Sequence, residues 1–314
     1  MKHNTHIYLA AKAIEFLREA VRDLRTLSGR RVSASVRRAY AAKAKRLQRL
    51  LRFHQDDILE ASWAPDDLLG DQRRFHTFKL FTSDVLPIGA DDYTKLIFRG
   101  HYRRGSGAGG VPYRVDHLAA LISDFRRLHD YNDHFTVRQV QYLYLLISHY
   151  VVDAHVPMHC DLRDDRPGPA STDKPGPIER YFDPGLHARV ERIWDRAVTP
   201  VALREGIIVA ETYKDHHRPT PLSEAVTFDV RKRSDRETIR AMRIPKGGLM
   251  DWMIDLCVKT YERSLRMFPV KGVKAKDARE GKGSGEAAAL GPEDTRMIMS
   301  EAITGLVSVW LAIG

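Results

Sequence analysis

The chain has 314 residues, 43% hydrophobic and 29% charged, which predicts a soluble globular protein with one large core or two modest ones. Its net charge of +10 favours a polyanionic partner such as nucleic acid, an anionic membrane surface or a phosphorylated small molecule, although solvated basic helix faces would give the same charge. The longest apolar run, "AITGLVSVWLAIG", is too short and too interrupted by Gly and Ser to span a bilayer, so no transmembrane segment is expected.

The N-terminal stretch lacks the pattern of a signal peptide, because Glu15, Arg18 and Glu19 interrupt its apolar residues at helical intervals. Cys160 and Cys257 are too few for a disulfide framework, and a disulfide between them is not expected. As written, the chain is expected to be cytoplasmic. It is expected to be secreted if a leader has been omitted.

Apolar residues recur at steps of three and four along most of the chain, which predicts amphipathic helices. The first is expected to be capped by Asn4 or Thr5. The predicted helices span approximately residues 5–27, 33–53, 115–129, 136–155, 184–203, 248–268 and 293–313. No segment alternates convincingly at period two, so the fold class is expected to be all-α, with several helices in a single main domain.

Three loop-rich stretches suggest the domain organisation. "GSGAGGVP" and "RDDRPGPASTDKPGP" interrupt a continuing helical pattern and are interpreted as surface excursions within one domain, residues 1–270. Residues 271–292 are basic and Gly-rich, and we expect a flexible linker there. This linker would tether a C-terminal helix within residues 293–314.

The stretch "SHYVVDAHVPMHC" places ionisable side chains in a central, mostly apolar helix. His149 and Asp153 are one helical turn apart, and Pro157 is expected to end the helix so that His159 follows in the next turn. A buried carboxylate is strongly unfavourable unless it is paired or binds a metal. A buried His–Asp hydrogen bond and a metal site both satisfy that requirement.

Similar residues recur elsewhere in the chain. "GLHARVERIWD" places His187 and Glu191 one helical turn apart, and "ASWAPDDLLGDQRRFHTF" places Asp66 and His76 around a loop. His6 stands at the head of the buried face of the first helix. Each of these alone could be an ordinary helix contact or an Asp-rich loop, but together they form a ligand set of the type that zinc prefers.

The order of these residues resembles the zinc-dependent phospholipase C family and its relatives, the single-strand-specific zinc nucleases. The pattern is an N-terminal His, a loop Asp, a His, then HxxxDxxxxxH and HxxxE. "NTHIYLAAKAIEFL" and the Pro65-Asp66 pair also resemble the zinc-phospholipase domain of glycosylphosphatidylinositol-specific phospholipase D. The resemblance extends from Met1 to about Trp194, and no residue after about Val270 contributes to it.

This resemblance implies a site for three zinc ions. The first ion would be held by Asp66, His76, His149 and Asp153, the second by His159, His187 and Glu191, and the third by His6, a bridging oxygen of Asp153 and the α-amine and carbonyl of Met1.

Two departures from the family pattern matter. The family usually has a tryptophan at the mature N-terminus, freed by signal cleavage, where this chain has Met1. We expect Lys2 to protect Met1 from removal, and His3 is a substitute ligand if the terminus is modified. Val156 replaces the usual Gln before the Pro of the "PMH" turn. This change leaves the ligands intact but could alter how they are oriented.

The resemblance implies hydrolysis of a phosphodiester by a metal-activated water, with Asp66 as the general base. Phospholipase C activity is expected ahead of nuclease activity because of the Pro65-Asp66, "PMH" and HxxxE details. The expected substrate is therefore a phospholipid, with a single-stranded nucleic acid as the alternative. An acyl-chain surface could come from residues 79–98 or the C-terminal helix, and a nucleotide surface from Tyr102, Arg103, Arg104, Tyr113 and Arg114, although either set could simply be packing. A third reading is a non-enzymatic, basic helical binding protein with structural zinc.

Overall fold

The computed structural model describes the chain in the following segments. These are residues 1–17, 19, 33–52, 59–71, 73–80, 110–128, 134–164, 182, 185–198, 203–204, 207–208, 224–226, 229–230, 248–268 and 291–314. The expected linker at 271–292 lies almost entirely outside the described residues, as do residues 20–27 of the first predicted helix.

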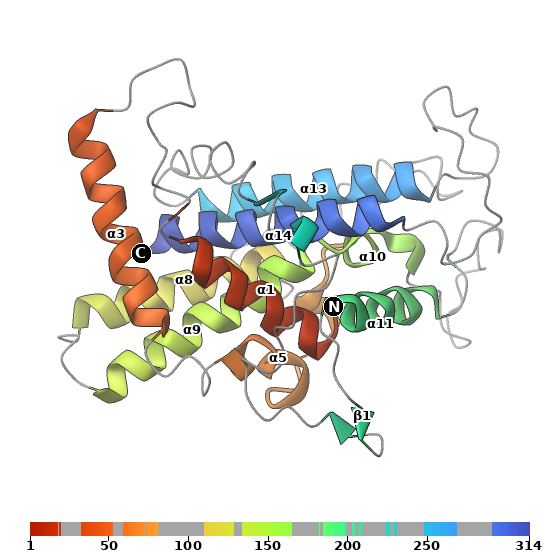
Figure 1. Ribbon diagram of the computed structural model, residues 1–314, viewed down its shortest axis with the longest axis horizontal. Coiled ribbons are helices and arrows are strands. Elements are labelled where there is room, and N and C mark those ends of the chain that lie inside the picture. Colours follow the sequence, from red (N-terminus) through yellow and green to blue (C-terminus); the bar gives the residue numbers. More distant parts are fainter. Residues whose placement is uncertain are drawn as a thin grey trace.

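The fold is all-α, as predicted (Figure 1). Among the described residues, the long helices are α1 (His3–Phe16), α3 (Ala34–Arg52), α8 (Val111–Leu128), α9 (His134–Asp153), α11 (Leu186–Val198), α13 (Leu249–Met267) and α14 (Pro292–Ile313). Short helical turns lie between them: η1 (Leu59–Ser62), α5 (Ala64–Asp67), α6 (Arg73–His76), α10 (Pro157–Cys160) and η2 (Leu162–Asp164). Within the described residues, extended structure is limited to the two-residue antiparallel strands β1 (Leu203–Arg204) and β2 (Ile207–Ile208) and to one bridge between Leu80 and Asp161.

Helix α9 lies at the centre of the core and packs against α8, α1 and α14. Its apolar side chains are buried on more than one side: Val140, Tyr144, Leu145, Ile147, Val151 and Val152. Ala10, Ala11 and Ala13 of α1 are fully buried. Because their side chains are small, α1 can lie close to the helices that it packs against. Burying each large aliphatic side chain stabilises the fold by about 1.5–3 kcal/mol. This packing holds the C-terminal end of α9 and the N-terminal end of α1 in fixed positions.

The C-terminal helix α14 packs into the same core and contacts α1, α9, α3 and α8. Trp310 donates its indole N–H to the carbonyl oxygen of Tyr144 at 3.0 Å, which joins α14 to α9. By length and composition α14 could cross a membrane, but 72% of its most apolar 18-residue window is buried inside the protein. That burial is what the core helix of a globular protein shows.

Two segments distant in sequence run side by side next to the end of α9. The backbone N–H of Phe78 donates to the carbonyl oxygen of His159 at 3.0 Å, and that of Leu80 to Cys160 at 2.9 Å. Pro157 begins α10 after the extended residue Val156, so the chain turns sharply there, as expected. Cys160 and Cys257 are both buried free thiols, in agreement with the sequence.

Candidate metal centre

All of the predicted ligands lie in one connected cluster that includes Asp153, the last residue of α9. They are Met1, His6, Asp66, His76, His149, Asp153, His159, His187 and Glu191. They come from six separate segments of the chain, because α1, α5, α6, α9, α10 and α11 all meet here. The side chains form three groups, each with its ligand atoms within 4.8 Å of one another, and the first two groups share His149.

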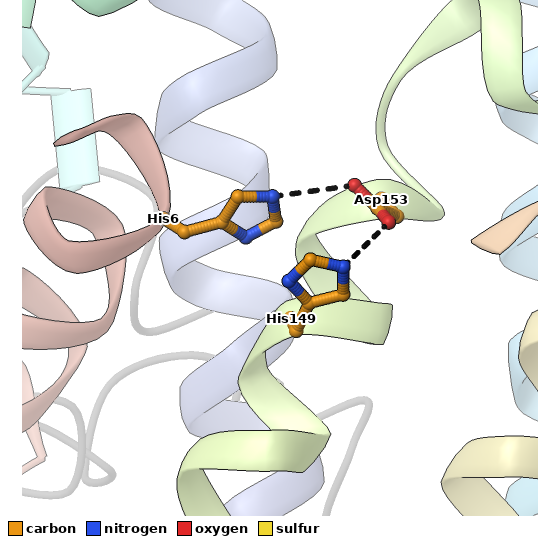
Figure 2. A group of neighbouring side chains, drawn as sticks. All are labelled: His6, His149 and Asp153. Atoms are coloured by element: carbon orange, nitrogen blue, oxygen red, sulfur yellow. Dashed lines mark ion pairs between the residues drawn. The ribbon is translucent and has the colours of Figure 1, made fainter. Parts of the chain in front are cut away.

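The first group joins α1 to α9 and is shown in Figure 2. His6 Nε2 lies 3.4 Å from Asp153 Oδ1, and His149 Nε2 lies 3.2 Å from Asp153 Oδ2. The two imidazole rings stack at 4.1 Å. The α-amine of Met1 lies 3.2 Å from Asp153 Oδ1, so this carboxylate oxygen faces both the terminus and His6.

The second group faces the solvent. His76 Nδ1 lies 2.9 Å from His149 Nε2, 3.2 Å from Asp153 Oδ2 and 3.3 Å from Asp66 Oδ1. The Asp66 side chain is 32% exposed, whereas those of Asp153 and His149 are almost wholly buried. Asp66 therefore marks the side from which a substrate could reach the centre.

The third group is carried by α10 and α11. His187 Nε2 lies 3.0 Å from both His159 Nε2 and Glu191 Oε1. Glu191 Oε1 also lies 2.7 Å from the α-amine of Met1, so the terminus lies between the first and third groups.

Hydrogen bonds on the outer side of the histidines indicate which nitrogen faces the centre. Nδ1 of His149 lies 2.9 Å from the carbonyl oxygen of Ser62, and Nδ1 of His159 lies 2.8 Å from that of His76. Nδ1 of His187 lies 3.0 Å from Asp164 Oδ2. Carbonyl and carboxylate oxygens only accept hydrogen bonds, so each Nδ1 must donate. A ring that is neutral with its proton on Nδ1 directs an unprotonated Nε2 inward.

These converging lone pairs fit a cation. When the rings are neutral, His159 Nε2, His187 Nε2 and Glu191 Oε1 are all acceptors 3.0–3.5 Å apart, so a metal ion could lie among them. In the metal-free chain the Met1 ammonium, 2.7 Å from Glu191 Oε1, supplies positive charge instead. In tetrahedral coordination with zinc bonds of 2.0–2.2 Å, ligand atoms are separated by roughly 3.3–3.6 Å. Neither ring nitrogen of the buried His6 has a hydrogen-bond partner, which leaves it able to bind a metal. The donor set therefore suits zinc.

The electrostatics reflect the same cluster of carboxylates. Burial alone would raise the pKa of Asp153, but the Met1 ammonium, His159 and His149 hold it well below its usual value. Burial would also raise the pKa of Glu191, and again the Met1 ammonium and the neighbouring histidines lower it. Burial alone would lower the pKa of the Met1 α-amine, but Asp153 and Glu191 raise it to about 10.

Sequence reasoning missed several residues that hold the ligands in place. Asp164 accepts from His187 and forms a 3.0 Å ion pair with the buried Lys79. Asp71 accepts from Tyr150 and from Arg114, at 2.8 Å for the arginine, and the N–H of Asp71 donates to Pro65 at 3.0 Å. These contacts anchor the turn that bears Asp66. Nothing in the local sequence distinguishes Asp164 or Asp71 from ordinary loop carboxylates.

The structure also locates several other residues that the sequence analysis named. Val156 is fully buried in the apolar core. His3 pairs with Glu60 at 2.7 Å, outside the three groups. Tyr113 stacks on His117, while Tyr102, Arg103, Arg104 and residues 81–98 lie outside the described residues. Helix α14 buries its apolar side chains and so does not present them to a substrate.

No protein-family model, curated protein or solved structure matches this chain.

Proposed function

We propose that this chain is a zinc-dependent phosphodiester hydrolase, most similar in action to phospholipase C, with single-strand-specific nuclease as the second candidate. The observation that carries the proposal is the convergence of histidine lone pairs and buried carboxylates around Asp153. A structural zinc site is closed by protein ligands, whereas a catalytic site keeps a position for water or substrate. The exposed carboxylate of Asp66 supports the catalytic alternative over the structural one.

Bound zinc would supply a Lewis acid and would lower the pKa of a water molecule from about 16 to about 7. The side chains of the protein would bind the zinc and transfer the proton. Asp153, His149 and His6 would bind zinc at the buried side of the site. Asp66, at the solvent side, would take the proton from the attacking water. No side-chain nucleophile is required.

A phospholipid substrate is supported by the turn that bears Asp66. Leu68 and Leu69 lie two and three residues after Asp66 and are 72% and 57% exposed. Exposed leucines can contact acyl chains but offer no aromatic ring on which a base could stack. An anionic lipid surface would also suit α3, in which every charged side chain is basic.

The test of this function is a comparison of substrates with a matched pair of variants. Zinc-loaded protein is assayed on phosphatidylcholine vesicles, single-stranded DNA and RNA, and a chromogenic phosphodiester. Asp66→Asn should lower hydrolysis by about 10³-fold, because it removes both a ligand and the base. Asp67→Asn, an exposed neighbour outside the metal groups, should have less than a twofold effect.

Preferential hydrolysis of vesicles would support phospholipase C, and preferential hydrolysis of nucleic acid would support the nuclease. If protein with a full complement of zinc hydrolyses none of these substrates, the enzyme proposal is wrong and the structural-zinc reading takes its place.

Extending the chain before Met1 should lower both activity and zinc content, because the α-amine lies between Asp153 and Glu191. Its pKa of about 10 means that zinc must displace one proton from the amine near neutral pH. The apparent zinc affinity of this site should therefore rise up to tenfold per pH unit until about pH 10. Calorimetry in buffers of different ionisation enthalpy measures the released proton.

The control is a cleavable fusion that regenerates Met1 as the first residue and should restore both quantities. A tagged protein that retains three zinc ions and full activity would contradict the role of the amine.

A further inference from the structure

The first turn of α1 lacks the local cap that the sequence predicts. The N-cap residue is Lys2, which makes no capping hydrogen bond, and Asn4 and Thr5 lie inside the helix. The capping group comes instead from α11. Asp195 Oδ1 accepts from the backbone N–H of Thr5 at 2.9 Å and from its hydroxyl at 3.2 Å. Asp195 Oδ2 accepts from the side-chain amide of Asn4 at 3.0 Å.

Asp195 belongs to the same stripe of α11 as two predicted ligands. His187, Glu191 and Asp195 follow one another at intervals of one helical turn, so all three lie on one face. Glu191 reaches the α-amine of Met1 at 2.7 Å, while Asp195 holds the next turn of α1. Figure 1 shows the N-terminus beside α11. Helix α11 thus contacts the N-terminal segment twice, through Glu191 and through Asp195. It also supplies His187 and Glu191 to the third group.

Such a restraint addresses a physical problem. Chain termini fray unless they are tied down, and the first N–H groups of a helix lack partners within that helix. A carboxylate at this position satisfies those donors and interacts favourably with the positive end of the helix. Asp195 therefore adds to the core packing of α1 and to the ion pairs of the Met1 amine with Asp153 and Glu191.

We propose that Asp195 is a positioning residue that holds the first turn of α1 so that the Met1 α-amine and the His6 imidazole face Asp153. The placement of the terminus is a property of the metal-free chain. Its consequence for metal binding rests on the proposed zinc-dependent function. The site for the third ion is therefore coupled to the second through α11.

The primary readout is acylation of the α-amine in the full-length, zinc-free protein. A limiting amount of an activated ester is added, and labelling of the N-terminal peptide is followed by mass spectrometry. Met1 is only 3% exposed in the wild-type chain, so its amine should be protected. Asp195→Ala should label at least tenfold faster. Asp124→Ala, which removes an exposed carboxylate paired with Arg127 on α8, should label at the wild-type rate.

A swapped pair provides the rescue. Asp195→Asn removes the carboxylate charge from the first turn of α1 and requires Asn4 to turn its amide over to accept from the new N–H₂, so it should lose part of the protection. Combining it with Asn4→Asp restores a donor facing an acceptor and should recover most of the protection. The buried thiols of Cys160 and Cys257 report on folding, since they stay unreactive in a folded variant. If Asp195→Ala exposes them, Asn4→Ala, which loses a single bond, replaces it in the comparison.

Zinc content is the second readout. Wild-type protein should hold three ions, and Asp195→Ala should hold two with the group of His159, His187 and Glu191 still filled. If the wild-type amine labels as fast as that of Asp195→Ala, or if both are equally protected, the inference is overturned. If labelling responds to Asp195 but wild-type protein binds no zinc, the positioning role stands and the proposed function fails.

Discussion

Replacing Asp153 by asparagine is expected to remove at least two of the three zinc ions and to lower hydrolysis by about 10³-fold or more. One oxygen of Asp153 faces Met1 and His6, and the other faces His76 and His149. An amide carries no negative charge and presents one donor, so it cannot replace both oxygens. Zinc content and hydrolysis are measured on the same preparation, with Asp67→Asn as the control.

The same variant should also change the stability of the metal-free protein. Removing one partner of a buried ion pair typically costs about 3–5 kcal/mol, because the other charge is left unpaired. The pKa of Asp153 is held low, so its contribution to stability is present above the unfolded pKa of about 4 and is lost as the pH falls through the folded value. Urea unfolding near pH 7 should therefore show the full loss. A variant that retains three zinc ions would contradict the central role of Asp153.

The sequence could predict the parts of the site that local geometry determines. His149 and Asp153, and likewise His187 and Glu191, are one turn apart on a helix, so the helical period alone puts each pair on one face. The break at Pro157 follows from the missing N–H and fixed φ of proline, which explains why His159 lies in the next short helix, α10. The all-α class follows from the same periodicity.

The sequence could not predict contacts that depend on tertiary packing. The expected local cap of α1 was wrong, because Asp195 approaches from a helix nearly two hundred residues away and satisfies the donors of Thr5 and Asn4. Asp164 and Lys79 meet behind His187 for the same reason. The grouping of Asp66 and His76 with α9 came only from the family resemblance, since no spacing rule links a loop to a distant helix.

A glycine in α14 determines how closely that helix approaches the end of α9. A Cβ atom built on Gly305 would lie 2.7 Å from Cε1 and 2.9 Å from Nε2 of His155. That ring cannot easily move, because it is buried and its Nδ1 lies 2.8 Å from the carbonyl oxygen of Val151. Burial lowers the pKa of His155 to about 4, so the ring is neutral at pH 7 and packs as part of the core.

Gly305→Val should therefore lower the free energy of unfolding by about 3 kcal/mol, even though glycine itself disfavours a helix by about 1 kcal/mol relative to alanine. For a protein of this size, that loss should lower the Tm by roughly 4–5 °C. Gly291→Val, at the start of the same helix, is the matched control, because the nearest atom to its Cβ is 3.9 Å away and its φ of −61° suits any residue. The control should lose no more than about 1 kcal/mol. Equal losses in the two variants would mean that α14 does not approach His155 as closely as described, and the packing that fixes the end of α9 beside the metal centre would have to be reconsidered.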